Sequence, residues 1–144
     1  MNIQDVLLPL HLLTLGFIAW NISHADHMGF SWIRGKTATL DEIKVRKYHR
    51  GIWIGLCLMI STGFLLFLPM REYLLTRPQF YVKMAFVLTL IINGFVIGHL
   101  QKIAISRSYN SLSTKEKLPL YISGGVSTLA WLGAALGGLY IIPD

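Results

Sequence analysis

Four blocks of apolar residues, each long enough to cross a membrane, constrain the fold of this chain most. A spanning helix needs about 17 to 25 predominantly apolar residues, and the blocks lie at 6–22, 51–68, 80–100 and 118–142. Of the 144 residues, 53% are hydrophobic and 14% charged, whereas a soluble domain carries about 25% charged residues. We therefore predict one all-α domain over residues 1–144, an antiparallel four-helix transmembrane bundle.

Several chemistries typical of soluble proteins find no support in the sequence. There is no phosphate-binding glycine loop and no Gly-x-Ser-x-Gly elbow. The only cysteine, Cys57, excludes an internal disulfide. No basic residue precedes the first apolar block and no small-residue cleavage site follows it, so we expect this block to remain as a span.

Turn and capping signals predict where the helices begin and end. The first loop is expected to run from about 23 to 38 with a turn at 34–36, and Thr39 with Glu42 fits a capping box that starts the second helix. Ser113 with Glu116 fits a second capping box, before the fourth helix. Pro69 is expected to end the second helix, and Pro78 to lie in the first turn of the third. No internal repeat is evident.

The basic residues predict the orientation in the membrane. Ten of them flank the first and third loops, at 34–50 and 102–117, and only Arg71, Arg77 and Lys83 lie toward the other face. Loops rich in lysine and arginine stay in the cytoplasm. We predict a multi-pass protein of a bacterial-type inner membrane with both termini on the outer side. The net charge of +6 thus follows from topology, and we expect no nucleic-acid partner.

Four histidines are expected at the cytoplasmic face. The segment 23–27 holds His24, Asp26 and His27, and the predicted threading brings His49 and His99 to the same level. Imidazole is the commonest metal ligand and also ligates haem iron. Ionisable groups in membrane segments are costly and are functional candidates by default.

Three interpretations of this histidine level stay open. In the first, His49 and His99 are the axial ligands of haem b, with His24 and His27 as alternates and Arg50 or Lys47 pairing the propionates. In the second, a non-haem metal such as copper or zinc is held by residues of the set His24, Asp26, His27, His49 and His99. In the third, these are interfacial histidines that hold no ligand.

A second polar pair, His11 and Lys83, lies about one turn inside the opposite face. If both face the bundle, they form a polar site that binds a carboxylate or polarises a substrate; otherwise Lys83 extends to the interface. His11 with Met70 and Met84 would alternatively suit Cu(I). On an ideal helix His11 and His24 point about 220° apart, so the two levels are not expected to share a face.

Short motifs resemble a group of bacterial four-span membrane proteins. They are Leu10-His11, His27 and Phe80-Tyr81-Val82-Lys83, and they resemble the HemJ-type protoporphyrinogen oxidases and the CopD-like copper-resistance domains. The HemJ resemblance implies haem binding, with His11 and Lys83 in essential catalytic roles. The CopD resemblance implies copper passage, which would recruit His11 and the methionines. Segment 23–27 stands where the HemJ-type pattern has a Leu-Pro-Arg-rich stretch.

The expected function is therefore that of a b-type haem-binding membrane protein in electron transfer or in oxidation of a membrane-soluble or tetrapyrrole substrate. Whether it is an oxidoreductase in its own right stays open. The alternatives are a copper- or other metal-handling protein, and a cofactor-free accessory subunit that packs through the glycines of the fourth helix. The lipid bilayer is the expected partner, with a homo-oligomer or a membrane redox partner left open.

Overall fold

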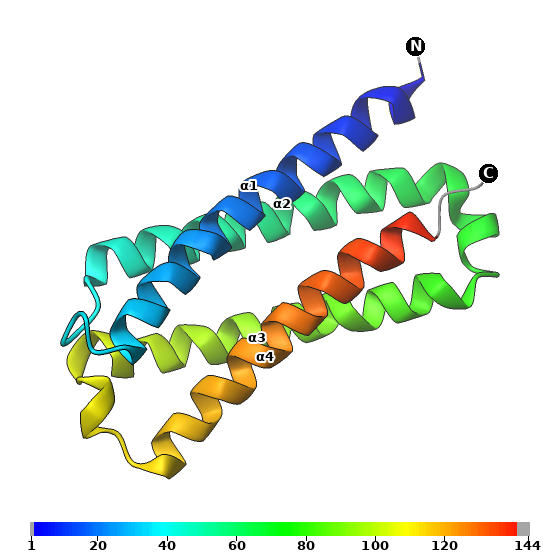
Figure 1. Cartoon of the computed structure of the whole chain (residues 1–144). Helices are drawn as coiled ribbons and strands as arrows, with labels where there is room; N and C mark the ends of the chain where they lie inside the picture. Colours follow the sequence, from blue (N-terminus) through cyan, green and yellow to red (C-terminus); the bar gives the residue numbers. More distant parts are fainter. Residues whose placement is uncertain (1, 141–144) are drawn as a thin grey trace. The chain divides into compact units, whose positions relative to one another are not determined.

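The computed structural model describes residues 2–140, which form four long α-helices and no strand (Figure 1). The elements are α1 (Ile3–Ile33), α2 (Glu42–Leu74), α3 (Pro78–Ser106), the 3₁₀ turn η1 (Tyr109–Ser111) and α4 (Thr114–Leu139). Each of the four α-helices is long and apolar enough to cross a membrane. The predicted all-α class with four spanning helices is confirmed, and the chain is a multi-pass membrane protein.

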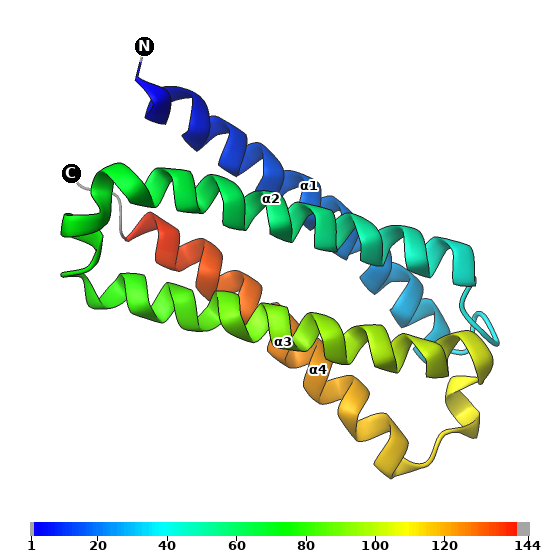
Figure 2. The same ribbon diagram turned by 180° about the vertical axis from the view of Figure 1, so that it is seen from behind.

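The chain divides into two compact units, each built on a helical hairpin. The first unit contains α1, α2 as far as Pro69, and the segment Gln101–Ser111. The second contains Met70–Leu100 and α4. Figures 1 and 2 show α1 running antiparallel to α2, and α3 running antiparallel to α4. Each pair buries its own contact surface, so the helix pair is the packing unit of this fold.

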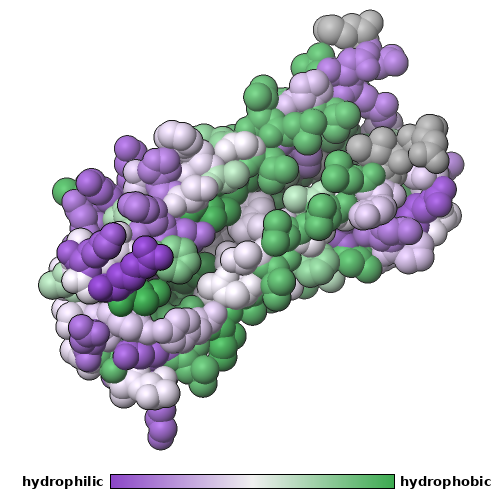
Figure 3. Space-filling view, viewed as in Figure 1, coloured by the Kyte–Doolittle hydropathy of each residue, from purple (hydrophilic) through white to green (hydrophobic). Residues whose placement is uncertain are grey.

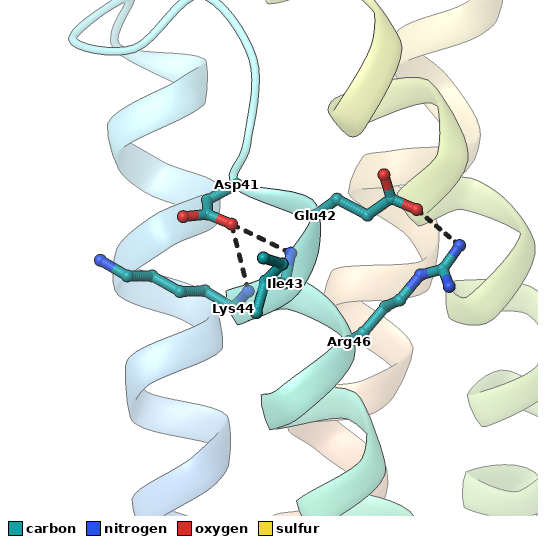
Figure 4. A network of polar contacts seen from close by, with 5 residues as sticks. All are labelled: Asp41, Glu42, Ile43, Lys44 and Arg46. Atoms are coloured by element: carbon teal, nitrogen blue, oxygen red, sulfur yellow. Dashed lines mark hydrogen bonds and ion pairs between the residues drawn. The ribbon is translucent and has the colours of Figure 1, made fainter.

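The start of α2 differs from the prediction. Asp41, not Thr39, is the cap: its Oδ1 accepts from the backbone N–H groups of Ile43 at 2.9 Å and Lys44 at 3.4 Å (Figure 4). The Leu40 N–H donates instead to the Ala104 carbonyl, at 2.9 Å. The Asp41 hydrogen bonds and the start of α2 at Glu42 place the cap two residues later than predicted, so the capping box predicted at Thr39 is wrong.

Glu42 has a different role from the one expected of it. Its carboxylate pairs with Arg46 one turn further along α2, as Figure 4 shows. Both side chains are largely exposed, and exposed ion pairs of this spacing contribute only about 0.3–0.5 kcal/mol. The pair therefore supports the first turn of α2 weakly, and the cap at Asp41 is the stronger start signal.

Two further boundaries differ from the prediction. The first helix continues to Ile33, so the segment 23–27 is helical and not part of a loop. The second helix continues through Pro69 to Leu74, because a proline removes one intrahelical hydrogen bond without preventing another turn. Pro78 does begin α3, as predicted.

Two local predictions are confirmed without change. Ser113 caps α4, with its Oγ accepting from Glu116 N–H at 3.3 Å and Glu116 Oε1 accepting from Ser113 N–H at 3.1 Å. The chain turns at 34–36, where Gly35 has a φ of +74°. This is the left-handed region that glycine enters at little cost.

The surface over the middle of the helices is apolar. Figure 3 shows hydrophobic side chains along the central stretches and hydrophilic ones toward the helix ends. Leu13 is 72% exposed, Phe95 69% and Leu129 68%. In water this much apolar exposure would be costly, whereas lipid tails satisfy it. The surface therefore suits embedding in a bilayer.

The first unit packs through small and polar residues. Leu7, Thr14, Ile18 and Asn21 are buried along one stripe of α1. Ile18 lies directly against Gly55 of α2, where any larger side chain would collide with it. Small residues let two helices approach closely in a membrane, where association depends on packing and not on the exclusion of water.

The second unit also packs through small and polar residues. The Phe86 ring of α3 lies against Gly133 of α4, beside a small buried cluster of Leu90, Ala130 and Ala134. Further along, Asn93 Nδ2 donates to the Ser123 carbonyl at 3.0 Å, and Ser123 Oγ donates to Asn93 Oδ1 at 2.9 Å. This two-bond link fixes the register of α3 against α4.

The two hairpins also match in register, although their sequences differ. The caps Asp41 and Ser113 are 72 positions apart, and so are the buried asparagines Asn21 and Asn93. Asn21 lies against residue 51 and Asn93 is bonded to residue 123, so each asparagine meets the residue 30 positions after it. The two helix pairs thus share the positions of their caps and contacts, while most residue types at matching positions differ.

Candidate functional site

His11 lies in the contact between α1 and α2. Its Nδ1 is 2.6 Å from the hydroxyl oxygen of Thr62, a buried residue of α2. A Cβ on Gly63 would lie 3.5 Å from His11 Cε1, so the ring is placed over a glycine of the facing helix. The imidazole is half-buried and is positioned by the hairpin itself.

The hydroxyl of Thr62 lies between His11 and two carbonyl groups of its own helix. The Thr62 hydroxyl donates to the Leu58 carbonyl at 2.8 Å and lies 3.2 Å from the Met59 carbonyl. A hydroxyl has one proton, and carbonyl oxygens only accept. With that proton donated to the Leu58 carbonyl, Thr62 Oγ1 accepts from His11 Nδ1–H, which leaves the lone pair of the ring on Nε2. This is the tautomer in which a histidine ligates a metal through Nε2.

His24 is held in a comparable way one level further along α1. Its Nδ1 is 2.9 Å from the Trp20 carbonyl oxygen, which only accepts, so Nδ1 carries the proton here too. The His24 ring centroid is 4.3 Å from the Trp20 ring and 5.4 Å from the Tyr48 ring, on which it stacks. Trp20 and Tyr48 thus fix the ring of a half-buried histidine.

The two histidines of α1 both contact α2, which differs from the expectation that they would not share a face. His11 meets Thr62 and His24 meets Tyr48. The long side chain of Tyr48 extends from α2 to the His24 ring. Thirteen residues of helix separate the two imidazoles by about 20 Å along the axis.

Asp26 and His27 are exposed on the same helix. His24 and His27 are i,i+3 neighbours, as predicted for a helix that continues past Ile22. In the part of the chain that the structure describes, no group of three or more His, Cys, Asp or Glu side chains is gathered to hold a metal ion. The non-haem metal site predicted for the histidine level, which also includes His99 of the second unit, stays a prediction.

His49 is engaged by a neighbour on its own helix. Trp53 Nε1–H donates to His49 Nε2 at 3.0 Å, so the two residues share a face of α2. The lone pair that would bind iron is therefore directed at the indole, and ligation through Nε2 requires Trp53 to move. The predicted propionate partners lie nearby in the sequence: Arg50 is exposed, and Lys47 Nζ is 5.7 Å from the Tyr48 ring centroid.

Lys83 and His99 belong to α3, in the second unit. Lys83 is half-buried against Gly137 and Gly138, and a Cβ on Gly138 would lie 3.0 Å from Lys83 Nζ. The cation thus lies against the last turn of α4, where the helix dipole favours positive charge. His99 is exposed on α3.

Three predicted groupings join residues of different units and stay predictions. They are the axial pair His49 and His99, the polar pair His11 and Lys83, and the copper set of His11 with Met70 and Met84. Each unit by itself gives only the local environments described above.

Sequence reasoning did not identify Thr62 as the partner of His11, or Tyr48 as the partner of His24. A signal for Thr62 was available, because polar residues within spans tend to form hydrogen bonds to a neighbouring helix. The sequence does not give the rotation of α2 that brings Thr62, and not Ser61, to His11.

No protein-family model, curated protein or solved structure matches this chain. The resemblance to HemJ-type and CopD-like proteins therefore stays a prediction.

Proposed function

We propose that this membrane protein binds b-type haem with His11 as an axial ligand, and that it acts in electron transfer or in oxidation of a membrane-soluble or tetrapyrrole substrate. The observation that carries the proposal is the Thr62 hydrogen bond to His11 Nδ1. A ligating histidine commonly donates its other ring N–H to a fixed acceptor, which sets the tautomer and the ring orientation. Thr62 supplies that acceptor from the facing helix.

The donor set favours haem over a non-haem metal. A structural or catalytic metal such as zinc needs three or four protein ligands. A porphyrin brings four nitrogen ligands of its own and takes one or two axial side chains from the protein. A single oriented imidazole in an apolar segment meets this smaller requirement.

The roles of the side chains follow from their positions. The haem, when bound, supplies the redox chemistry. Thr62, which contacts His11 Nδ1, would orient the imidazole when the iron is bound through Nε2. His24, about 20 Å away along α1, is too distant to be the second axial ligand of the same iron. The Nδ1 of His24 also faces a fixed acceptor, the Trp20 carbonyl, whereas the Nε2 of His49 accepts from Trp53. His24 is therefore a better candidate than His49 for the ligand of a second haem near the predicted cytoplasmic face.

The test is an absorption spectrum of the detergent-purified protein, oxidised and dithionite-reduced, with iron, copper and zinc analysed on the same sample. We expect a Soret band and sharp reduced α and β bands in the wild type, and loss of most haem in His11→Ala. Thr62→Val removes the hydrogen bond at nearly constant volume, and we expect haem affinity to fall about 10–100-fold.

His49→Ala and His99→Ala serve as matched controls, and both are expected to retain haem. Retention of wild-type haem content by a folded His11→Ala variant would overturn the assignment of His11. If haem is instead lost in His49→Ala and His99→Ala, the axial pair predicted from the sequence is right. If the purified protein contains stoichiometric copper or zinc and no haem, the proposed function is wrong and the protein handles that metal.

A further inference from the structure

The second unit carries an open groove of about 420 Å³ between α3 and α4. Its walls are the apolar side chains of Val96, Leu118, Pro119 and Ile122. Asn93 and Ser123 line one end, and Lys115 lies at the other. The groove is separate from His11 and from the other histidines, none of which lines it.

The polar groups at one end of the groove already have hydrogen-bond partners within the helix pair. Asn93 and Ser123 are both buried and are bonded to each other twice, at 2.9 and 3.0 Å. Their side-chain polar atoms are thus satisfied by the helix pair. What the groove offers to an occupant over most of its length is hydrocarbon surface.

The other end of the groove is cationic. Lys115 is exposed in the first turn of α4, where the helix dipole adds partial positive charge. Eight residues of helix separate Lys115 from Ser123, which is about 12 Å along the axis. The groove therefore runs from a charged helix start, at a predicted membrane surface, toward the middle of an apolar span.

We propose that this groove binds one acyl chain of an anionic glycerophospholipid, with Lys115 pairing the phosphate of the headgroup. The apolar walls match the chain, and the single cation at the mouth matches the charge of the headgroup. Basic residues of this kind on the cytoplasmic side of membrane helices are typical contacts of anionic lipids. The inference is independent of haem binding.

Lipid retention tests the proposal directly. The delipidated full-length protein is incubated with phosphatidylglycerol or phosphatidylcholine of identical chains, and the lipids kept after detergent exchange are counted by native mass spectrometry. We expect the wild type to retain more phosphatidylglycerol than phosphatidylcholine. In Lys115→Gln we expect the ratio of retained phosphatidylglycerol to retained phosphatidylcholine to fall about fivefold. That factor corresponds to the roughly 1 kcal/mol of one basic residue near an anionic surface.

Two matched pairs of variants separate the headgroup from the chain. Lys102→Gln removes an exposed lysine of α3 that does not line the groove, and we expect it to keep the preference. Val96→Trp fills the groove and should reduce retention of both lipids, whereas Leu129→Trp, on an exposed position outside the groove, should not.

Three results would overturn the proposal. One is an unchanged lipid preference in Lys115→Gln, and the second is unchanged retention of both lipids in a folded Val96→Trp variant. The third is dissociation of an oligomer by Val96→Trp without any change in bound lipid, because the groove would then be a contact between copies of the chain. Lys115→Gln alters only an exposed side chain, so it remains a fair test if the tryptophan variant does not fold.

Discussion

The glycines of α4 differ in what surrounds them. A Cβ on Gly133 would lie 2.6 Å from Cε2 and Cζ of the Phe86 ring, whereas nothing lies within 4 Å of a Cβ on Gly124 or Gly125. Gly133 therefore allows α3 and α4 to approach, and Gly124 has no such role within this unit.

We predict that Gly133→Ala destabilises the protein and that Gly124→Ala does not. The added methyl at 133 must displace the Phe86 ring, and overpacking of this kind costs about 1–3 kcal/mol. At 124 the same change only removes a glycine from a helix, which is neutral or stabilising by up to about 1 kcal/mol. Unfolding of both variants by increasing dodecyl sulfate in mixed micelles, followed by circular dichroism, measures the difference. Equal stability of the two variants would contradict the close approach at Gly133.

At this scale the sequence predicts residue types better than it predicts their partners. It identified His11, Lys83 and the glycines as unusual within apolar spans, because charge and size are visible in one chain. It did not separate Gly133 from Gly124, or find Thr62 opposite His11, because both depend on the rotation of one helix against another. Spans that are apolar all round do not encode that rotation in a hydrophobic stripe.

At the scale of the helices, the start of α2 is the clearest case of competing local signals. Thr39 and Asp41 are both good capping residues, and Glu42 follows each of them at a short distance. In the structure the side chain of Asp41 accepts from the first-turn N–H groups of α2, so Asp41 is the cap. The capping box of Ser113 with Glu116 was predicted correctly.

We predict that Asp41→Ala destabilises the first turn of α2 and that Thr39→Ala leaves it unchanged. Removal of a capping side chain costs about 0.5–2 kcal/mol, and here it leaves the N–H groups of Ile43 and Lys44 without their acceptor. Amide hydrogen exchange over residues 42–46, followed by mass spectrometry, should accelerate in the first variant only. Faster exchange in Thr39→Ala, and not in Asp41→Ala, would instead support the capping box that the sequence predicts at Thr39.

Helix existence and type could thus be predicted at this scale, and helix length only in part. All four predicted spans are helices over the residues that the structure describes, because long apolar runs have no other stable form in a membrane. The predicted end of the fourth span, at 142, lies outside the described residues. The boundaries at 22 and 69 were wrong, because polar residues such as His24 and even Pro69 can continue a helix whose contacts already hold it. Hydropathy marks where a helix leaves the hydrocarbon, and not where its hydrogen bonds stop.

At the scale of the whole molecule, the orientation in the membrane follows from charge. The connection between α1 and α2 and the start of α2 are rich in lysine and arginine, whereas the connection between α2 and α3 is not. We predict that the first connection lies in the cytoplasm and the second outside.

Single cysteines measure this orientation in intact cells. In a Cys57→Ser background, Thr76→Cys lies between α2 and α3 and is expected to react with a membrane-impermeant maleimide. Thr37→Cys, between α1 and α2, should react only after the membrane is opened. Labelling of Thr37→Cys alone in intact cells would reverse the topology, and with it the side on which Lys115 meets the lipid headgroups.

The make-up of the first unit has a consequence for biosynthesis. The end of α1 and the loop after it are tied to later residues. Leu40 N–H donates to the Ala104 carbonyl at 2.9 Å, and Trp32 Nε1–H donates to the Arg107 carbonyl at 3.0 Å while its ring packs edge-on against Tyr109. A nascent chain that has not reached residue 101 lacks all three partners. Synthesis must therefore pass the end of α3 before the polar end of the first helix pair can be completed, so the first unit cannot finish folding while only α1 and α2 have been made.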